Sequence, residues 1–290
     1  MGIIIASRKS KLAQIQTDLV MDMIYQKHKL KCDKILLDTK GDRILDVSLD
    51  KIGGKGAFVK EIEMAMLQGL AEAAVHSMKD VPYEMPEGFE LVSMPIREDP
   101  RDAYISMNGI RIEDLPRGAR IGTSSKRRSC QILQLRPDLE LVSIRGNVQS
   151  RVNKIETENL DGIILAAAGL KRLGMECIIT QYFNVEEIVP AIGQGAIGIE
   201  ILKNNANIHI FKSIEDAETR ICVDAERSFM RRLNGGCHAP IGAYARLQND
   251  DMYIQGVFET NGKFIKKDIL GSKYDYIKLG TLLGEKIIND

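Results

Sequence analysis

The chain has 290 residues, and 40 Lys and Arg are balanced by 40 Asp and Glu, which leaves no formal net charge. This balance and an aromatic content of 5% argue against a nucleic-acid-binding protein, which needs a basic surface and stacking side chains. The five cysteines form no CxxC pair, and their odd number predicts reduced thiols and no cysteine-based metal site. No apolar run is long enough for a membrane span, so we expect a cytoplasmic protein of two or three domains.

The first elements predict an anion site. Apolar residues 3–6 indicate a buried strand, and apolar residues at helical spacing between 12 and 24 indicate a helix. Arg8 and Ser10 lie between them, where the free N–H groups and the dipole of a helix attract negative charge. The alternative is an ordinary helix cap by Ser10 beside a solvated arginine.

A second strand delivers another pair of polar residues. After a strand at 34–38, the glycine-rich segment 52–58 predicts either a lid over a ligand or an ordinary flexible connection before a helix at 58–70. The strand at 73–76 then leads to Lys79 and Asp80, at the end where open α/β sheets bind ligands. The lysine can contact an anion and the aspartate can handle protons, although a solvated ion pair is the simpler alternative. We expect His76 to be structural.

The next stretch predicts a second α/β unit with basic strand-to-helix junctions. After a strand at 89–96, the charged segment 97–105 is interpreted as a crossing between domains. Three strand-to-helix junctions follow, and their hydroxyl and cationic residues are Thr123, Ser125, Arg127, Arg128, Arg145, Arg151 and Arg172. A solvated basic face is the alternative at any one junction. Together with the Arg8 junction, they predict a cleft for a molecule with several carboxylates or phosphates.

The segment 189–201 combines glycines with a strand. Its GxGxxG spacing resembles a dinucleotide fingerprint, but Gly193 and Gly195 precede the strand, so we reject that interpretation. We predict instead a second crossing, which returns the chain to the first domain and includes Gln194. Two crossings are typical of a cleft that closes by hinge motion.

The C-terminal part predicts a small α+β domain with a reactive thiol. A helix at 214–233, strands at 241–247, 252–258 and 264–270, and a helix at 274–288 are expected. Cys237 lies on a loop between two glycines and Pro240, where an exposed thiol would be available for covalent chemistry. The alternative is a small buried residue near a helix end.

The expected fold class is therefore α/β with three domains: two lobes like those of periplasmic binding proteins, joined by a double crossover, and a small α+β domain carrying Cys237. The predicted domains are residues 1–96 plus 195–213, residues 101–190 and residues 214–290. Such a fold also suits a two-lobed protein that binds a small anion without turnover.

The ordered set of motifs resembles the porphobilinogen deaminase family, also called hydroxymethylbilane synthases. The similar segments are residues 7–10, 76–82, 122–128, 145–147, 168–172, 193–195 and 234–237, within a likeness that spans about residues 3–245. The resemblance implies a transferase of tetrapyrrole and heme biosynthesis. It would join four porphobilinogen molecules head to tail, release ammonia and yield hydroxymethylbilane.

The resemblance also assigns roles to residues. Cys237 would carry a dipyrromethane cofactor through a thioether, and Asp80 would be the catalytic carboxylate. Residues expected to contact the cofactor are Lys79, Asp80, Thr123, Ser125, Arg127, Arg128 and Arg151. Residues expected to bind substrate are Arg8, Ser10, Arg145, Arg151, Arg172 and Gln194. By the same likeness we expect a monomer, with no metal and no membrane partner.

Overall fold

The computed structural model describes residues 2–39, 59–234, 239–260 and 262–290. The chain divides into two compact units, Met1–Arg97 with Ala196–Ile221, and Glu98–Gly195 with Cys222–Asp290. We call these unit 1 and unit 2. The chain passes between them after Arg97, after Gly195 and again within a long helix after Ile221. The separate third domain expected from residue 214 stays a prediction.

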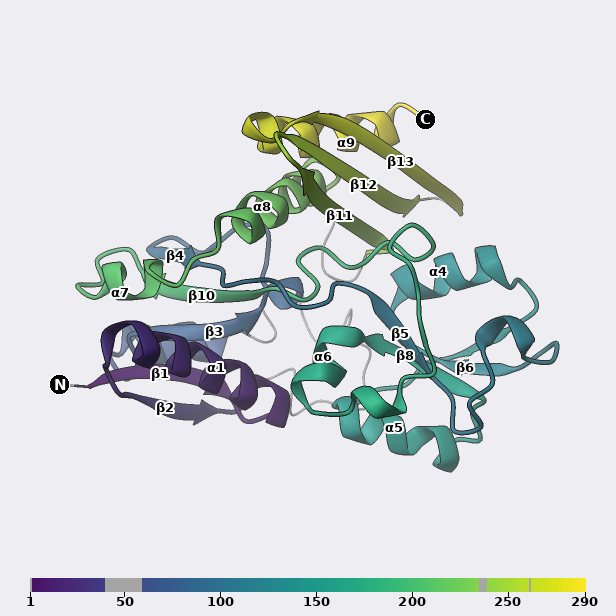
Figure 1. The fold of residues 1–290 in the computed structure, drawn as a ribbon, viewed down its shortest axis with the longest axis horizontal. Coiled ribbons are helices and arrows are strands. Elements are labelled where there is room, and N and C mark those ends of the chain that lie inside the picture. Colours follow the sequence, from purple (N-terminus) through teal and green to yellow (C-terminus); the bar gives the residue numbers. More distant parts are fainter. Residues whose placement is uncertain (1, 40–58, 235–238, 261) are drawn as a thin grey trace. The chain divides into compact units, whose positions relative to one another are not determined.

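Unit 1 contains a five-stranded sheet in the order β2-β1-β3-β10-β4 (Figure 1). Its strands are β1 (Ile3–Arg8), β2 (Cys32–Leu37), β3 (Ala73–Ser77), β4 (Phe89–Ser93) and β10 (Ile197–Leu202). β1 pairs in parallel with β2 and β3, whereas β10 is antiparallel to β3 and β4. Because β1 and β3 are parallel neighbours, their carboxyl ends lie at the same edge of the sheet.

Apolar side chains attach helices to both faces of this sheet. On one face, α1 (Lys11–His28) and α7 (Ile208–Lys212) contribute Val20 and Phe211 to a core that includes Ile5 and Ile199. On the other face, α3 (Lys60–Leu67) packs Ile62 in a core that includes strand residues. Each fully buried isoleucine, valine or phenylalanine stabilises the fold by roughly 1.5–3 kcal/mol.

Unit 2 repeats this topology in its own sheet, in the order β7-β6-β8-β5-β9. Its strands are β5 (Asp102–Ile105), β6 (Arg120–Gly122), β7 (Glu140–Val142), β8 (Gly162–Ala166) and β9 (Gln181–Tyr182). β6 is parallel to β7 and β8, and β5 is antiparallel to β8 and β9. β5 and β10, the first strands after the first two crossings, take the same antiparallel fourth place in their sheets. The predicted α/β class is confirmed.

The helices of this sheet also cover both faces. α4 (Lys126–Leu135) packs Ile132 into a core with Ile121 and Ile164. The opposite core contains Ile155 of α5 (Val148–Thr157) and Leu170 of α6 (Ala167–Arg172). The alternation of strand side chains explains why both faces need cover.

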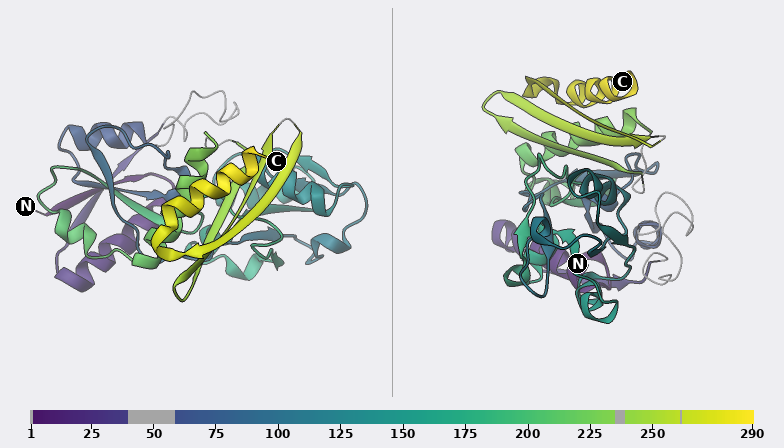
Figure 2. Two further views of the ribbon diagram at one scale, coloured as in Figure 1. Left: turned by 90° about the horizontal axis from the view of Figure 1, so that it is seen from above. Right: turned by 90° about the vertical axis from the view of Figure 1, so that its right-hand side faces the viewer.

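The C-terminal part of unit 2 is an antiparallel meander of three strands with two helices (Figure 2). These elements are α8 (Ala217–Arg232), β11 (Ile241–Gln248), β12 (Asp251–Thr260), β13 (Lys263–Ser272) and α9 (Tyr276–Ile288). A Cβ at Gly256 of β12 would lie 2.6 Å from Phe229 of α8 and 3.1 Å from Leu283 of α9, so both helices pack on that face. The expected α+β composition is confirmed.

Some boundaries differ from the sequence-based expectations. The strand expected at 89–96 ends at Ser93, and the segment 97–105 interpreted as a crossing contains β5. That segment concealed a strand because Pro100 and charged residues precede an apolar run of only three residues. No helix in the described part of the chain is both long and apolar enough to cross a membrane.

Candidate active site

The first predicted junction lies at the start of α1 in unit 1. Arg8 ends β1, and Ser10 caps the helix by accepting a hydrogen bond from the Ala13 backbone N–H at 3.3 Å. The neighbouring Lys9 pairs with Asp38 at 2.6 Å. Ser10 therefore forms the helix cap that was the alternative interpretation, and N–H groups of the first helical turn can attract an anion as well.

Asp80 lies at the same sheet edge as Arg8. It ends a short 3₁₀ turn, Met78–Asp80, which follows β3 directly. Arg8 Nη1 lies 3.8 Å from Asp80 Oδ2, and the two side chains are 21% and 33% exposed. Lys79 is half-buried in the same turn. A partly exposed carboxylate in so loose an ion pair can accept N–H donors from a ligand.

His76 lies on β3, three residues before Lys79, and its side chain is buried against the neighbouring strand. Its Nε2 lies 2.8 Å from Oε2 of Glu200 on the neighbouring strand β10, and the two side chains are 4% and 1% exposed. This is in line with the expectation that His76 is not catalytic.

The second set of predicted residues lies in unit 2, at the start of α4. Ser125 caps this helix by accepting from the Arg128 backbone N–H at 3.4 Å, and Thr123 Oγ1 accepts from the Ser125 N–H at 3.2 Å. Arg127 and Arg128 are only 4% and 6% exposed, which contradicts the alternative of a solvated basic face for these two side chains. The junction therefore combines helix-capping hydroxyls with two buried guanidinium groups.

Both guanidinium groups are held by one carboxylate, that of Asp102 at the start of β5. Arg127 Nη1 donates to Asp102 Oδ2 at 2.7 Å, and Arg128 donates to Oδ1 through Nε at 3.0 Å and Nη2 at 2.8 Å. Gln194 also donates to Oδ1, at 2.9 Å. Burial alone would raise the pKa of Asp102, but Arg127 and Arg128 outweigh it and hold that pKa well below its ordinary range. The sequence reasoning missed Asp102, whose signal is an acid directly before the apolar run 103–105.

The next junctions in unit 2 place three further predicted arginines. Asn147 caps α5, accepting from the Ser150 backbone N–H at 2.9 Å, and Arg145 is half-buried just before this cap. Arg151 Nε donates to the Gly146 carbonyl at 2.7 Å. Arg172, at the end of α6, donates to the Gly195 carbonyl at 2.7 Å, and burial lowers the pKa of its guanidinium. Apart from Gln194, which precedes β10, the described residues expected to bind ligand thus follow the carboxyl ends of parallel strands in both units.

Two predicted features lie outside the described residues. These are Cys237, with the glycines before it, and the possible lid at residues 52–58. Among the described residues, no group of three or more His, Cys, Asp or Glu side chains is placed to hold a metal ion.

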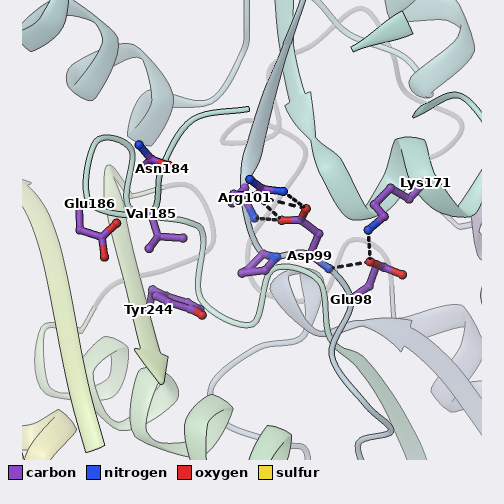
Figure 3. Close-up of a pocket in the computed structure, with 9 residues that line it drawn as sticks. Glu98, Asp99, Arg101, Lys171, Asn184, Val185, Glu186 and Tyr244 are labelled. Atoms are coloured by element: carbon purple, nitrogen blue, oxygen red, sulfur yellow. Dashed lines mark hydrogen bonds and ion pairs between the residues drawn. The ribbon is translucent and has the colours of Figure 1, made fainter. Parts of the chain in front are cut away.

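A pocket of about 440 Å³ in unit 2 contains none of the predicted site residues (Figure 3). Its charged side chains contact one another: Lys171 pairs with Glu98 at 2.9 Å, and Arg101 with Asp99 at 2.7 Å. Burial alone would raise the pKa of Glu98, but the Asp99 N–H and Lys171 lower it below its usual value. These two cations therefore already have carboxylate partners.

Comparison with known proteins places the chain in a family. Residues 3–210 match the model of the porphobilinogen deaminase dipyromethane cofactor binding domain, and residues 220–289 match the porphobilinogen deaminase C-terminal domain. Porphobilinogen deaminases of Clostridium botulinum (strain Langeland) and Clostridium perfringens (strain SM101) are each 58% identical over 290 residues and cover 100% of both chains. That of Clostridium kluyveri is 57% identical over 98% of both chains.

Solved structures give a more distant likeness. The methionine-binding protein MetQ covers 73% of this chain and 89% of its own, with a TM-score of 0.47 and 11% identity. A periplasmic substrate-binding protein from Coxiella burnetii covers 78% of this chain and 96% of its own, also with a TM-score of 0.47 and 11% identity. The family assignment comes from the two family models and the full-length relatives. The chain belongs to the porphobilinogen deaminase family.

Proposed function

We propose that the protein joins four porphobilinogen molecules head to tail, with release of ammonia, to give hydroxymethylbilane. The observation that carries this proposal is the 58% identity over the full 290 residues to a porphobilinogen deaminase. The alternative of a small-anion binding protein without turnover is not favoured, because the two family models together account for residues 3–210 and 220–289.

The side chains at the strand ends suit a dipyrromethane cofactor. Its pyrrole rings carry acetate and propionate groups, and guanidinium, ammonium and hydroxyl groups are the donors that bind carboxylates. When attached to Cys237, the cofactor supplies the primer to which substrate is joined. We assign the contacts with its carboxylates to a set in both units, namely Lys79, Thr123, Ser125, Arg127, Arg128 and Arg151.

Asp80 is assigned the catalytic role. Its carboxylate accepts hydrogen bonds from pyrrole N–H groups and stabilises the positive charge that develops on the substrate as ammonia leaves. Arg8 Nη1, 3.8 Å from Oδ2, is far enough away to leave the carboxylate oxygens available to these donors. The proton released from the attacking pyrrole carbon can be taken up at Asp80 Oδ.

Substrate carboxylates are assigned to a second set of polar residues, which shares Arg151 with the cofactor set. The proposed set is Arg8, Ser10, Arg145, Arg151, Arg172 and Gln194. Arg172 is the clearest case, because burial already lowers the pKa of its guanidinium, so that a carboxylate partner stabilises the charged form.

The cofactor proposal is tested by intact mass. Purified protein should exceed its sequence mass by one dipyrromethane and colour with Ehrlich's reagent. Cys237→Ser should have the sequence mass and no colour, whereas the control Cys177→Ser, which removes an exposed free thiol, should match the wild type. Fully active wild type of unmodified mass would refute the cofactor assignment.

The catalytic role of Asp80 is tested by turnover. Asp80→Asn should fold normally and retain the cofactor, yet lower ammonia release by about a hundredfold, because a charge-stabilising group is lost. Asp18→Asn removes the carboxylate of an exposed ion pair with Lys34 and should leave turnover within twofold. Wild-type binding of porphobilinogen without ammonia release would instead support the binding-protein alternative.

We also propose that the protein acts as a cytoplasmic monomer without nucleic acid. Light scattering coupled to gel filtration should give the mass of one chain. Retention on a heparin column at physiological salt would contradict the absence of a polyanion partner.

A further inference from the structure

A buried cluster in unit 2 consists of Asp102, Arg127 and Arg128. The proposed function gives a role to the two arginines but none to Asp102. Asp102 is 0% exposed, and each of its carboxylate oxygens accepts from a different arginine. Backbone carbonyl groups accept further hydrogen bonds from both arginines. Arg127 Nη1 also donates to the Val189 carbonyl at 2.7 Å, and Arg128 Nη1 donates to the Ile164 carbonyl at 3.0 Å. The two guanidinium groups are therefore fixed by partners on three different segments.

The cluster has one positive charge more than it has negative charges. Two guanidinium groups face one carboxylate, and the charged groups that influence Arg127 are Asp102 and Arg128. A buried charge is costly unless it is paired. The surplus charge therefore favours one further anion at this place.

The hydrogen bonds show which edge faces that anion. All three side-chain nitrogens of Arg128 donate to Asp102 or to Ile164. Among the described residues, the side chain of Arg127 donates hydrogen bonds through Nη1 and makes none through Nε or Nη2. These two atoms form the edge of a guanidinium that binds a carboxylate with two parallel hydrogen bonds.

The stem of Arg127 packs against a glycine of β11. A Cβ built on Gly242 would lie 2.9 Å from Arg127 Cδ and 2.6 Å from the Pro190 carbonyl, so the absence of a side chain at Gly242 lets the arginine stem pass. Gly242 stands five positions after Cys237 in the chain. The arginine is thus fixed at its stem by β11 and at its Nη1 by Asp102.

We propose that Asp102 is a positioning residue, which orients the Nε and Nη2 edge of Arg127 toward one carboxylate of the dipyrromethane. The inference rests on the proposed function, and it adds a residue that does not itself touch the cofactor. Gln194 takes part through the hydrogen bond it donates to Asp102. Without the carboxylate, the two guanidinium groups repel each other and lose their common acceptor.

The test measures cofactor loading. Unloaded protein, made in cells that cannot produce porphobilinogen, is incubated with increasing porphobilinogen, and attached dipyrromethane is read by intact mass. Circular dichroism confirms that each sample is folded. Asp99→Asn is the matched control, because Asp99 is nearby in the chain, 9% exposed and paired through both oxygens with one arginine.

Asp102→Asn should need at least about ten times more porphobilinogen for half-maximal loading, and Asp99→Asn should stay within twofold of the wild type. Loss of the negative charge alone would strengthen anion binding, so weaker loading identifies orientation as the cause. Loading of folded Asp102→Asn within twofold of the wild type, or at lower concentrations, would overturn the inference. A wild type that gains no mass would instead refute the proposed function.

Asp102→Glu gives a second test, which applies even where Asp102→Asn does not fold. It keeps the charge but moves the carboxylate by one methylene. A positioning role predicts half-maximal loading at roughly three times the wild-type concentration or more, and better loading than folded Asp102→Asn. Loading equal to the wild type would show that only the charge is needed and would contradict the positioning role.

Discussion

Buried ionisable side chains in unit 1 connect elements that are far apart in the sequence. His76 Nε2 of β3 lies 2.8 Å from Glu200 Oε2 of β10, and Glu200 Oε1 has no hydrogen-bond partner among the described residues. Burial raises the pKa of Glu63 on α3, and Glu200 raises it further. The three side chains therefore form one electrostatic cluster that joins α3, β3 and β10.

Removing the acid of this pair should destabilise the protein. Glu200→Gln is expected to lower the free energy of unfolding by about 2 kcal/mol, because it disturbs a buried hydrogen bond of 2.8 Å between His76 and Glu200. Glu158→Gln, which breaks a surface pair with Lys154, should cost less than about 0.5 kcal/mol. Urea unfolding measures both, and equal losses would contradict a special role for burial.

The raised pKa of Glu63 predicts a pH dependence of stability. A carboxyl whose pKa is higher in the folded state favours its neutral form there, so it reduces stability as pH rises from the unfolded pKa through the folded one. Glu63→Gln cannot ionise and should gain stability relative to the wild type as pH rises above about 4.3. Thermal unfolding from pH 4 to pH 8 measures the difference in stability between Glu63→Gln and the wild type. A variant that loses stability relative to the wild type as pH rises would contradict the prediction.

At the scale of elements, capped helix starts and close helix packing set the local geometry. Ser10, Ser125 and Asn147 each accept a backbone N–H three residues later, which fixes where α1, α4 and α5 begin. The contact between α8 and α9 depends instead on Gly280. A Cβ there would lie 2.1 Å from the Ala225 carbonyl oxygen and 2.0 Å from Ser228 Oγ.

Gly280→Ala should separate α8 from α9. The clash with the helix backbone is expected to cost about 2 kcal/mol, despite the better helix propensity of alanine. Lys278→Ala is the control on the same helix, since Lys278 is exposed. Its stability should change by less than about 0.5 kcal/mol, and urea unfolding of both variants decides between the two effects.

At the scale of the whole molecule, each unit is built around a sheet that receives a strand from a crossing chain. The crossing stretches meet within unit 2, where Glu98 N–H donates to the Gly195 carbonyl at 3.2 Å. Gly195 has a φ of +91°, and a Cβ there would lie 2.3 Å from the Glu98 carbonyl oxygen. Only glycine satisfies both conditions.

Gly195→Ala is therefore expected to lower the stability of the fold at the contact between Gly195 and Glu98. A left-handed φ costs a side chain roughly 1–2 kcal/mol, and the backbone clash adds to that. Gly174→Ala has a similar φ of +68° but meets nothing within 4 Å, so it should lose only about 1 kcal/mol. Equal losses in thermal unfolding would show that the clash is relieved by a small shift.

Residue patterns alone predicted much of the fold. The helix starts at Ser10 and Ser125 could be predicted because each serine directly precedes a segment with apolar residues at helical spacing. A capping hydroxyl and the N–H that it accepts are only three residues apart, so the signal is local. The α/β class follows from strands alternating with helices. The ordered motifs also led to the family before any contact was known, since each motif is short and contiguous.

Pairings between distant residues were decided by the tertiary structure. The sequence predicted arginines at 127 and 128 but not their shared acceptor Asp102, 25 and 26 positions earlier. It likewise marked His76 as structural without its partner Glu200, 124 positions away. Local periodicity determines which face of an element is buried, whereas strand order determines which buried charges meet. The sequence by itself therefore determined the elements, the basic junctions and the family, and only the folded sheets decided that Arg127 and Arg128 share one buried carboxylate.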